Sequence, residues 1–263
     1  MKEANSIYAL EFSEPITEDV TKLSLAEDKP RIFIAGDSTA CNYRHAGANN
    51  RYPRTGWGQV FGEQFNDNIQ VVNCAISGRS SLSFRREVNY RFICENMRRG
   101  DYLFIQFAHN DSKAEDRSRF TSPDDGSYQS SICEYINAAR GAGAEPVLCT
   151  SVTRNLISDT TLEPYGNALK ELARANGTAL LDMYEHTHSL LLELGADVYG
   201  QRYMNLAPRD SRFSGYADFS RSEYYENGCA DNTHLNITGA REAAAAAADE
   251  LKRICHPLSA YLI

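Results

Sequence analysis

The sequence predicts an α/β protein in which a five-stranded parallel sheet lies between two layers of helices. Two observations carry this prediction. Short apolar runs bounded by turn residues alternate along the chain with longer amphipathic segments, a pattern typical of parallel strands joined by helices. The chain has 263 residues, which lies within the range of one large domain with a single core. We therefore expect a three-layer α/β/α sandwich.

Five apolar runs are expected to form the buried strands. In chain order they are residues 31–35, 69–73, 102–107, 146–150 and 178–182. Apolar residues at helical spacing predict helices over 131–141 and 165–176, the second of which ends at Gly177. The last helix is expected to begin near Thr238 and to continue through the alanine-rich segment 240–254.

Two segments do not fit this alternation. Residues 1–29 contain only a weak β segment at 7–12, so we expect an N-terminal extension or the remnant of a preceding β segment, with the main domain over 30–263. Residues 195–228 are rich in Tyr, Arg, Ser and Asp and show little periodicity. We expect them to form a long loop, and long loops near a site commonly act as lids or binding loops.

Charge, hydropathy and cysteine usage exclude several partners and compartments. The net charge of −8, from 35 acidic and 27 basic residues, argues against nucleic-acid binding, because phosphate neutralisation needs a basic face. The apolar stretches are far too short to span a bilayer, so no membrane partner is expected. Seven scattered cysteines and the absence of an apolar signal segment in residues 1–6 favour the cytoplasm, although removal of a leader would make the protein secreted. The oligomeric state stays open.

Four short polar blocks mark predicted strand and helix ends, where α/β proteins place their chemistry. They are Gly36-Asp37-Ser38, Gly78-Arg79-Ser80, His109-Asn110-Asp111 and Asp231-Asn232-Thr233-His234. Ser38 follows the first strand, so we expect its hydroxyl to act as a nucleophile in the cleft at the carboxyl edge of the sheet. The alternative is that Ser38 only caps a helix.

The last block supplies the groups that a serine nucleophile needs. A serine hydroxyl is a poor nucleophile until a base removes its proton, and that base needs a third group to hold its tautomer. We expect His234 to be the base and Asp231 its orienting carboxylate. The alternative is that Asp231 caps a turn while His234 packs against the last helix. The segment His186-Thr187-His188 lacks a third ligand at a recognised spacing, so no metal site is expected.

Donors for a developing oxyanion are also present. Gly78 follows the second strand and allows a close backbone approach, Asn110 follows the third strand, and the Ser38 amide would be the third donor. Taken separately, Gly78 is explained as a turn residue and Asn110 as an Asx-turn. The order of the four blocks favours an oxyanion hole instead, and together they predict a serine esterase that requires no cofactor.

These blocks resemble those of the SGNH hydrolases, also called the GDSL esterase superfamily. The four invariant residues of that family correspond here to Ser38, Gly78, Asn110 and His234. Asp231 corresponds to the aspartate of its Asp-x-x-His block. The match covers about residues 30–262, and it implies a flavodoxin-like SGNH hydrolase fold with residues 30–263 as the catalytic domain.

The chain is similar in particular to the rhamnogalacturonan acetylesterases, carbohydrate esterase family 12. This similarity rests on Asn73 and on residues 35–39, 56–59, 77–80, 100–102, 106–111 and 231–236. It implies removal of acetyl groups from a plant cell-wall polysaccharide, most specifically rhamnogalacturonan (pectin), or from its oligosaccharides, without a metal or organic cofactor. One departure is Ala108, where the branch usually has glycine; its methyl group is expected to narrow the pocket or shift the backbone path.

Candidate substrate contacts follow less directly. The basic cluster after the second strand comprises Arg79, Arg85, Arg86 and Arg91. It would hold galacturonate carboxylates through bidentate contacts, or else form a solvated helix face. Trp57 would stack on a sugar ring or belong to the core. Asp37 and His109 complete the candidate contacts, with Arg79 and Trp57.

Two rival functions stay open. Lipases, thioesterases and acetylhydrolases that act on xylan or on small or lipid esters use the same constellation, and a long-chain enzyme is expected to have a wider apolar groove. A carbohydrate-binding protein that kept the fold and lost the chemistry is the alternative from a different class. The presence of the nucleophile, base, orienting carboxylate and oxyanion donors disfavours it.

Overall fold

The computed structural model describes residues 20–263 except Ala217, so the weak β segment expected at 7–12 lies outside the described residues. One five-stranded sheet forms its centre, and every neighbouring pair of strands is parallel. The strands are β1 (Arg31–Gly36), β2 (Gln70–Asn73), β3 (Tyr102–Gln106), β4 (Glu145–Cys149) and β5 (Ala179–Leu181), in the spatial order β2-β1-β3-β4-β5. All five predicted strands are confirmed.

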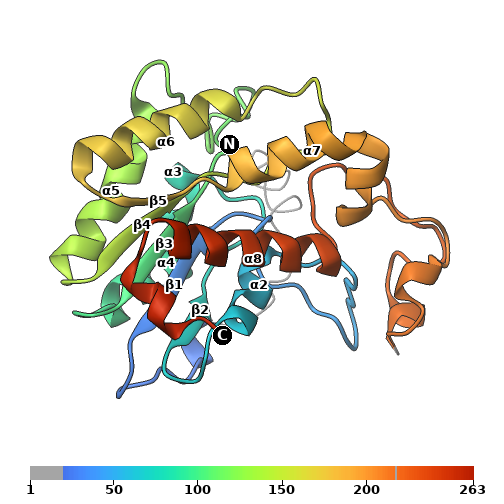
Figure 1. The fold of residues 1–263 in the computed structure, drawn as a ribbon, viewed down its shortest axis with the longest axis horizontal. Helices are drawn as coiled ribbons and strands as arrows, with labels where there is room; N and C mark the ends of the chain where they lie inside the picture. The colour runs from blue at the N-terminus through green and yellow to red at the C-terminus, as the bar shows by residue number, and fades with distance from the viewer. Residues whose placement is uncertain (1–19, 217) are drawn as a thin grey trace, which may run out of the picture.

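Helices cover both faces of the sheet, which confirms the predicted three layers (Figure 1). One face is packed by α3 (Ser81–Phe84), α4 (Val88–Asn96), α5 (Ser127–Gly141) and α6 (Glu163–Asn176). The other face is packed mainly by α2 (Trp57–Val60), α7 (Met183–Tyr199) and α8 (Ile237–Arg253). Short 3₁₀ helices complete the described chain: η1 (Val20–Lys22), η2 (Phe61–Gln64), η3 (Gly200–Arg202), η4 (Ser211–Phe213), η5 (Phe219–Arg221) and η6 (Pro257–Tyr261).

The continuous apolar run of β1 results from this double covering. Ile32 and Ile34 belong to the core cluster under α2 and α8, whereas Phe33 and Ala35 belong to the cluster under α5 and α6. Because successive side chains of a strand point to opposite faces, a central parallel strand needs apolar residues at every position. All six residues of β1 are buried accordingly.

The predicted helix bounds hold at the C-terminal ends better than at the starts. α5 begins at Ser127 rather than residue 131, because its first turn is polar apart from Tyr128 and shows no helical period. α8 begins at Ile237, and the side chain of Asn236 caps it by accepting from the backbone amides of Thr238 and Gly239.

The order of the strands fixes where the polar blocks meet. β1 and β3 are neighbours at the centre of the sheet. From β1 the chain continues to β2 on one side, and from β3 it continues to β4 on the other side. The carboxyl edge at such a switch point leaves a crevice between the following loops. The loops after β1, β2 and β3, which carry Ser38, Gly78 and Asn110, therefore lie around one crevice.

The segment 195–228, expected as a loop, contains regular turns. α7 continues through a kink at Gly195 (φ 76°, ψ 157°) to Tyr199, and η3, η4 and η5 follow. Within these turns, Phe213 and Phe219 pack with Tyr52 and two aliphatic side chains in a small separate core. Short 3₁₀ turns around an aromatic cluster have no long helical period, which is why the sequence pattern predicts a loop.

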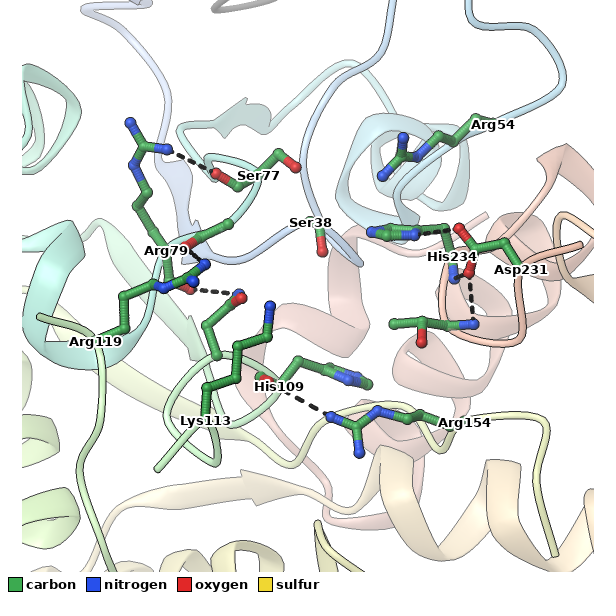
Figure 2. Close-up of a pocket in the computed structure, with 13 residues that line it drawn as sticks. Ser38, Arg54, Ser77, Arg79, His109, Lys113, Arg119, Arg154, Asp231 and His234 are labelled. Atoms are coloured by element: carbon green, nitrogen blue, oxygen red, sulfur yellow. Dashed lines mark hydrogen bonds and ion pairs between the residues drawn. The ribbon is translucent and has the colours of Figure 1, made fainter. Parts of the chain in front are cut away.

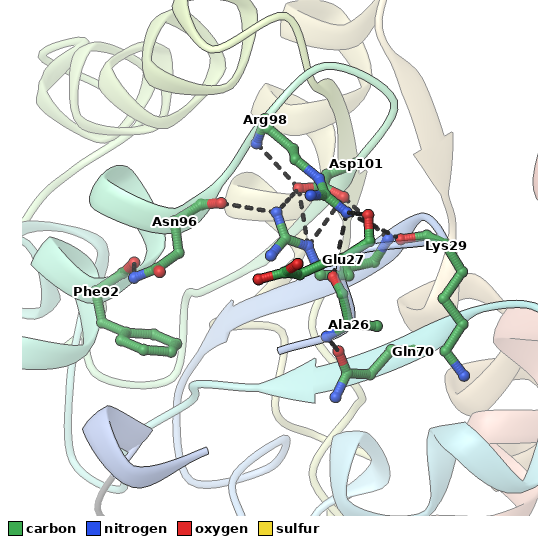
Figure 3. Close-up of polar contacts among 9 residues, drawn as sticks. Ala26, Glu27, Lys29, Gln70, Phe92, Asn96, Arg98 and Asp101 are labelled. Atoms are coloured by element: carbon green, nitrogen blue, oxygen red, sulfur yellow. Dashed lines mark hydrogen bonds and ion pairs between the residues drawn. The ribbon is translucent and has the colours of Figure 1, made fainter. Parts of the chain in front are cut away.

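A buried ion pair ties the start of β1 to the start of β3 at the edge of the sheet opposite the crevice (Figure 3). Asp101 accepts from the Arg31 side chain at 2.6 Å and from the backbone amides of Arg31 and Arg98 at 3.0 and 2.9 Å. The Arg98 guanidinium donates to the carbonyl oxygens of Ala26 and Glu27. Gln70 of β2 also accepts from the backbone amide of Ala26 and donates to the carbonyl oxygen of Ser24. This part of the predicted extension is therefore bound to the sheet.

Asp101→Asn is expected to lower the free energy of unfolding by about 3 kcal/mol, because it leaves the buried Arg31 guanidinium without a counter-charge. Urea unfolding measures this as a lower midpoint with an unchanged slope. Asp249→Asn is the control, since the Asp249–Lys252 pair is exposed, and it is expected to change stability by less than about 0.5 kcal/mol. Equal effects of the two substitutions would contradict the assignment.

Candidate active site

The turn after β1 presents Ser38 to a pocket and turns Asp37 inward. The Asp37 carboxylate accepts from the backbone amide of Thr39 at 2.9 Å and from its hydroxyl at 2.8 Å, and the Asp37 side chain is fully buried. The Tyr43 hydroxyl donates to the carbonyl oxygen of Ser38 at 2.8 Å. This turn is therefore held from both sides, and the Ser38 hydroxyl lines the pocket (Figure 2).

Asp231 and His234 form a hydrogen-bonded pair within one turn ahead of α8. The distance from His234 Nδ1 to Asp231 Oδ2 is 2.6 Å, and Asp231 Oδ1 accepts from the backbone amides of Thr233 and His234. Burial disfavours the ionised carboxylate, but the hydrogen bond and charge of His234 with these amides outweigh it and hold the pKa of Asp231 well below its usual range. An ionised carboxylate only accepts, so Nδ1 carries the proton and Nε2 is left as an acceptor.

The imidazole of His234 lies between Ser38 and Asp231 (Figure 2). Its Nδ1 edge faces Asp231, and its other edge is turned toward the Ser38 side chain. The geometry thus brings together the three residues that the sequence suggests as nucleophile, base and orienting carboxylate.

Gly78 and Asn110 line the same pocket. Gly78 has a φ of +74°, a left-handed conformation that favours glycine. The Asn110 side-chain amide donates to the carbonyl oxygen of Arg79 at 3.0 Å, which holds it beside the Gly78 turn. Asp111 joins the loop after β3 to the loop after β2, because its carboxylate accepts from the backbone amide and the hydroxyl of Ser81. Burial raises the pKa of Asp111 to about 7 despite these hydrogen bonds.

The side chains that line the pocket are polar or charged, apart from Gly78, and the pocket has a volume of about 300 Å³. Five of them are cations: Arg54, Arg79, Lys113, Arg119 and Arg154. Among the described residues of the lining, Asp231 is the one acidic side chain, and it is hydrogen-bonded to His234. In a chain with a net charge of −8, this concentration of positive charge makes the pocket suited to an anionic ligand.

Two of the four predicted substrate contacts lie at the pocket, namely Arg79 and His109. His109 is buried, its Nε2 lies 3.0 Å from the carbonyl oxygen of Val152, and burial lowers the pKa of its imidazole to about 4. Asp37 and Trp57 do not reach the pocket. Trp57 is fully buried in the core under α8, where its indole N–H donates to Gln106 at 3.0 Å.

The sequence pattern missed four of the five cations. Arg54, Lys113, Arg119 and Arg154 come from three separate loops, and only the fold brings them to Ser38. The predicted cluster after β2 contributes Arg79 alone; Arg85 lies 3.7 Å from Glu134 of α5 instead. Lys113 and Arg154 could have been found from the sequence, because each is a basic residue that follows soon after a predicted strand, the third and the fourth.

Trp57→Phe is expected to lower the free energy of unfolding by about 1–3 kcal/mol, because it removes the buried hydrogen bond that the side-chain oxygen of Gln106 accepts from the indole. The KM for an acetylated sugar should stay within about twofold, since the side chain does not reach the pocket. Urea unfolding and steady-state kinetics of the same preparation measure both quantities. A raised KM with an unchanged free energy of unfolding would show instead that Trp57 contacts the substrate.

A family profile described as the GDSL-like Lipase/Acylhydrolase family matches residues 34–241. The chain belongs to this family. As a GDSL-like acylhydrolase it is an ester hydrolase, and the resemblance seen in its motifs is confirmed. The chain is 32% identical over 240 residues to the rhamnogalacturonan acetylesterase RhgT of Bacillus subtilis, covering 89% of this chain and 94% of RhgT. It is 28% identical over 219 residues to a rhamnogalacturonan acetylesterase of Emericella nidulans, covering 81% of each.

Two solved structures share this fold. YxiM of Bacillus subtilis superposes with a TM-score of 0.67 at 23% identity, covering 87% of this chain; this chain spans only 58% of that one. Axe2, an acetylxylan esterase from Geobacillus stearothermophilus, gives a TM-score of 0.57 at 17% identity, covering 86% and 96%. At these identities the likeness establishes the α/β/α fold of this GDSL-like hydrolase.

Two further features bear on the expectations about membranes and metals. Within residues 20–263 without Ala217, no helix is both long and apolar enough to cross a bilayer. In the same described part of this GDSL-like hydrolase, no three His, Cys, Asp or Glu side chains are grouped as metal ligands. His186 and His188 lie on α7, and neither is among the residues that line the pocket.

Proposed function

We propose that this chain is a serine acetylesterase that removes acetyl groups from rhamnogalacturonan or its oligosaccharides, with residues 30–263 as the catalytic unit. The observation that carries the proposal is a pocket with cationic and polar side chains around Ser38 and the Asp231–His234 pair. Relatives named rhamnogalacturonan acetylesterases, one of them 32% identical, support the substrate.

The proposed mechanism is a two-step acyl transfer. His234 Nε2 takes the Ser38 proton while Ser38 Oγ attacks the acetyl carbonyl carbon, and the negative charge moves to the carbonyl oxygen. The backbone amides of Ser38 and Gly78 and the side-chain amide of Asn110 donate to this oxyanion. When the tetrahedral intermediate collapses, the sugar oxygen leaves with the proton held on His234, and the acetyl group stays on Ser38.

Deacylation repeats these steps with water as the nucleophile. His234 removes a proton from the water, the resulting oxygen attacks the acetyl-Ser38 carbonyl, and His234 returns the proton to Ser38 Oγ as acetate leaves. Asp231 stays ionised throughout and stabilises the imidazolium. These residues complete the reaction without a metal or organic cofactor.

The pocket lining separates this proposal from its rivals. None of the described residues that line the pocket carries an aliphatic or phenyl side chain, so a long acyl chain would bury little apolar surface there. A neutral xylan chain would bring no anionic group to a lining that holds five cations. Rhamnogalacturonan carries galacturonate carboxylates, which match the charge of the lining.

The test is acetate release from acetylated rhamnogalacturonan oligosaccharides, measured beside acetylated xylan oligosaccharides and the 4-nitrophenyl esters of acetate and palmitate. We expect the highest kcat/KM on the pectic substrate, activity on the acetate ester and none on the palmitate. A preference for xylan would keep the esterase mechanism and overturn the substrate. No release from any ester would favour a binding protein that has lost the chemistry.

A further inference from the structure

Three of the pocket arginines are already balanced by acids that lie outside the lining. Arg79 pairs with Glu87 at 2.8 Å, Arg119 with Asp116 at 2.6 Å, and Arg154 with Asp159 at 2.8 Å. These pairs fix the guanidinium groups in place. The fourth arginine, Arg54, lies on the His234 side of the pocket, above the Tyr43 ring at 4.6 Å.

Lys113 differs from the arginines. It lines the pocket, and among the described residues its ammonium group has neither a hydrogen bond nor an ion pair. Figure 2 shows the side chain rising from the loop after β3 toward Ser38, with Arg119 on one side and Arg154 on the other. Burial and the Arg119 charge, and to a smaller degree Arg154, lower the pKa of Lys113, with Glu115 partly opposing them.

A partly desolvated ammonium group beside two guanidinium groups is destabilised, and an anion placed among them offsets that cost. Because Arg79, Arg119 and Arg154 have their own acids, a single carboxylate placed beside Lys113 would balance the charge on this side of the pocket. The pocket also places this charge within the same cavity as the Ser38 hydroxyl, so the anion and the ester belong to one substrate molecule.

We propose that Lys113, flanked by Arg119 and Arg154, binds the carboxylate of a uronic acid residue in the substrate and makes the enzyme select acidic over neutral acetylated saccharides. The identity of the saccharide rests on the proposed function, whereas the recognition of a carboxylate rests on the pocket itself. Lys113 is therefore a specificity-determining residue, distinct from the groups that form and break the ester bond.

The first experiment compares acetylated rhamnogalacturonan oligosaccharides with the same oligosaccharides after reduction of their carboxyl groups to primary alcohols. Lys113→Met is expected to lower the ratio of kcat/KM values, acidic over reduced, at least tenfold, mainly through KM. Lys113→Arg should retain the ratio, because it keeps the charge. Arg86→Met, which removes an exposed positive charge outside the pocket lining, should leave the ratio at the wild-type value.

Two results would overturn the assignment. An equal loss on both substrates would show that Lys113 acts in the chemistry or in folding, and an unchanged ratio would show that it contacts no carboxylate. Circular dichroism of each variant checks that a loss is not caused by misfolding.

A second experiment separates this inference from the proposed function. Galacturonate is expected to inhibit 4-nitrophenyl acetate hydrolysis at least tenfold more strongly than its methyl ester, and Lys113→Met should remove the difference. If galacturonate inhibits in this way but no acetate is released from rhamnogalacturonan, the proposed substrate is wrong and the carboxylate site stands. If rhamnogalacturonan is deacetylated but galacturonate and its methyl ester inhibit equally, the carboxylate site is wrong.

Discussion

Ser38→Ala will lower kcat for acetate release by about 10⁶-fold, the scale seen when a serine nucleophile is removed from a triad that acts as a unit. The methyl side chain cannot form an acetyl-enzyme, so only the oxyanion donors and substrate positioning contribute. The turn after β1 is held by hydrogen bonds of Asp37, Thr39 and Tyr43 that do not involve the Ser38 hydroxyl. The free energy of unfolding should therefore change by less than about 1 kcal/mol.

Ser77→Ala is the matched control, because Ser77 lines the same pocket and has no part in the proposed chemistry. Initial rates on 4-nitrophenyl acetate for both variants, with urea unfolding of each, complete the test. A Ser38→Ala protein that keeps more than about a hundredth of the wild-type kcat would remove Ser38 from the role of nucleophile, whatever the substrate.

Asp231→Asn will lower kcat by about 10⁴-fold while leaving KM nearly unchanged. The side-chain oxygen of the asparagine would continue to accept from the amides of Thr233 and His234. Its NH₂ group would then face His234 Nδ1, where Oδ2 lies in the native turn. Because NH₂ only donates, the imidazole would adopt the tautomer with the proton on Nε2 and could not take the Ser38 proton.

The pH dependence of kcat/KM tests the same pair. The pKa of Asp231 is held well below its usual range, so the carboxylate stays ionised from about pH 4 to 8 and adds no proton-binding step there. Asp231 should therefore contribute no protonation of its own to the acid limb of the wild-type profile in this range. Asp249→Asn, at an exposed site, is the control. A loss below about a hundredfold in Asp231→Asn would contradict the assignment.

The strands and the polar blocks could be predicted because both signals are local. Each strand is a short apolar run, and the residues that meet at the crevice directly follow β1, β2 and β3 or precede α8. In a parallel sheet the carboxyl ends of neighbouring strands lie at one edge, so position along the chain was enough to bring Ser38, Gly78 and Asn110 together.

The cationic lining could not be predicted in this way, because its members share no sequence neighbourhood. Lys113 and Arg119 lie in the loop after β3, Arg154 in the loop after β4, and Arg54 just ahead of α2. Trp57 shows the reverse failure: an aromatic residue near a polar motif suggests a sugar contact, yet α2 packs it into the core. Which side of a short helix is buried depends on the distant α8, and no local pattern reports it.

The position of Asp231 and His234 in one turn has a consequence for how this site responds to movement. The Asp231 carboxylate accepts from the imidazole of His234 and also from the backbone amide of His234, three residues along the chain. The turn therefore holds its proton acceptor in a fixed orientation. A shift of the turn relative to the sheet would change the gap between Nε2 and Ser38 but not the imidazole tautomer. Loop substitutions that slow this enzyme should therefore lower kcat without shifting the acid limb of its pH profile. Grafting the turn onto another protein would transfer the base and its orienting carboxylate together.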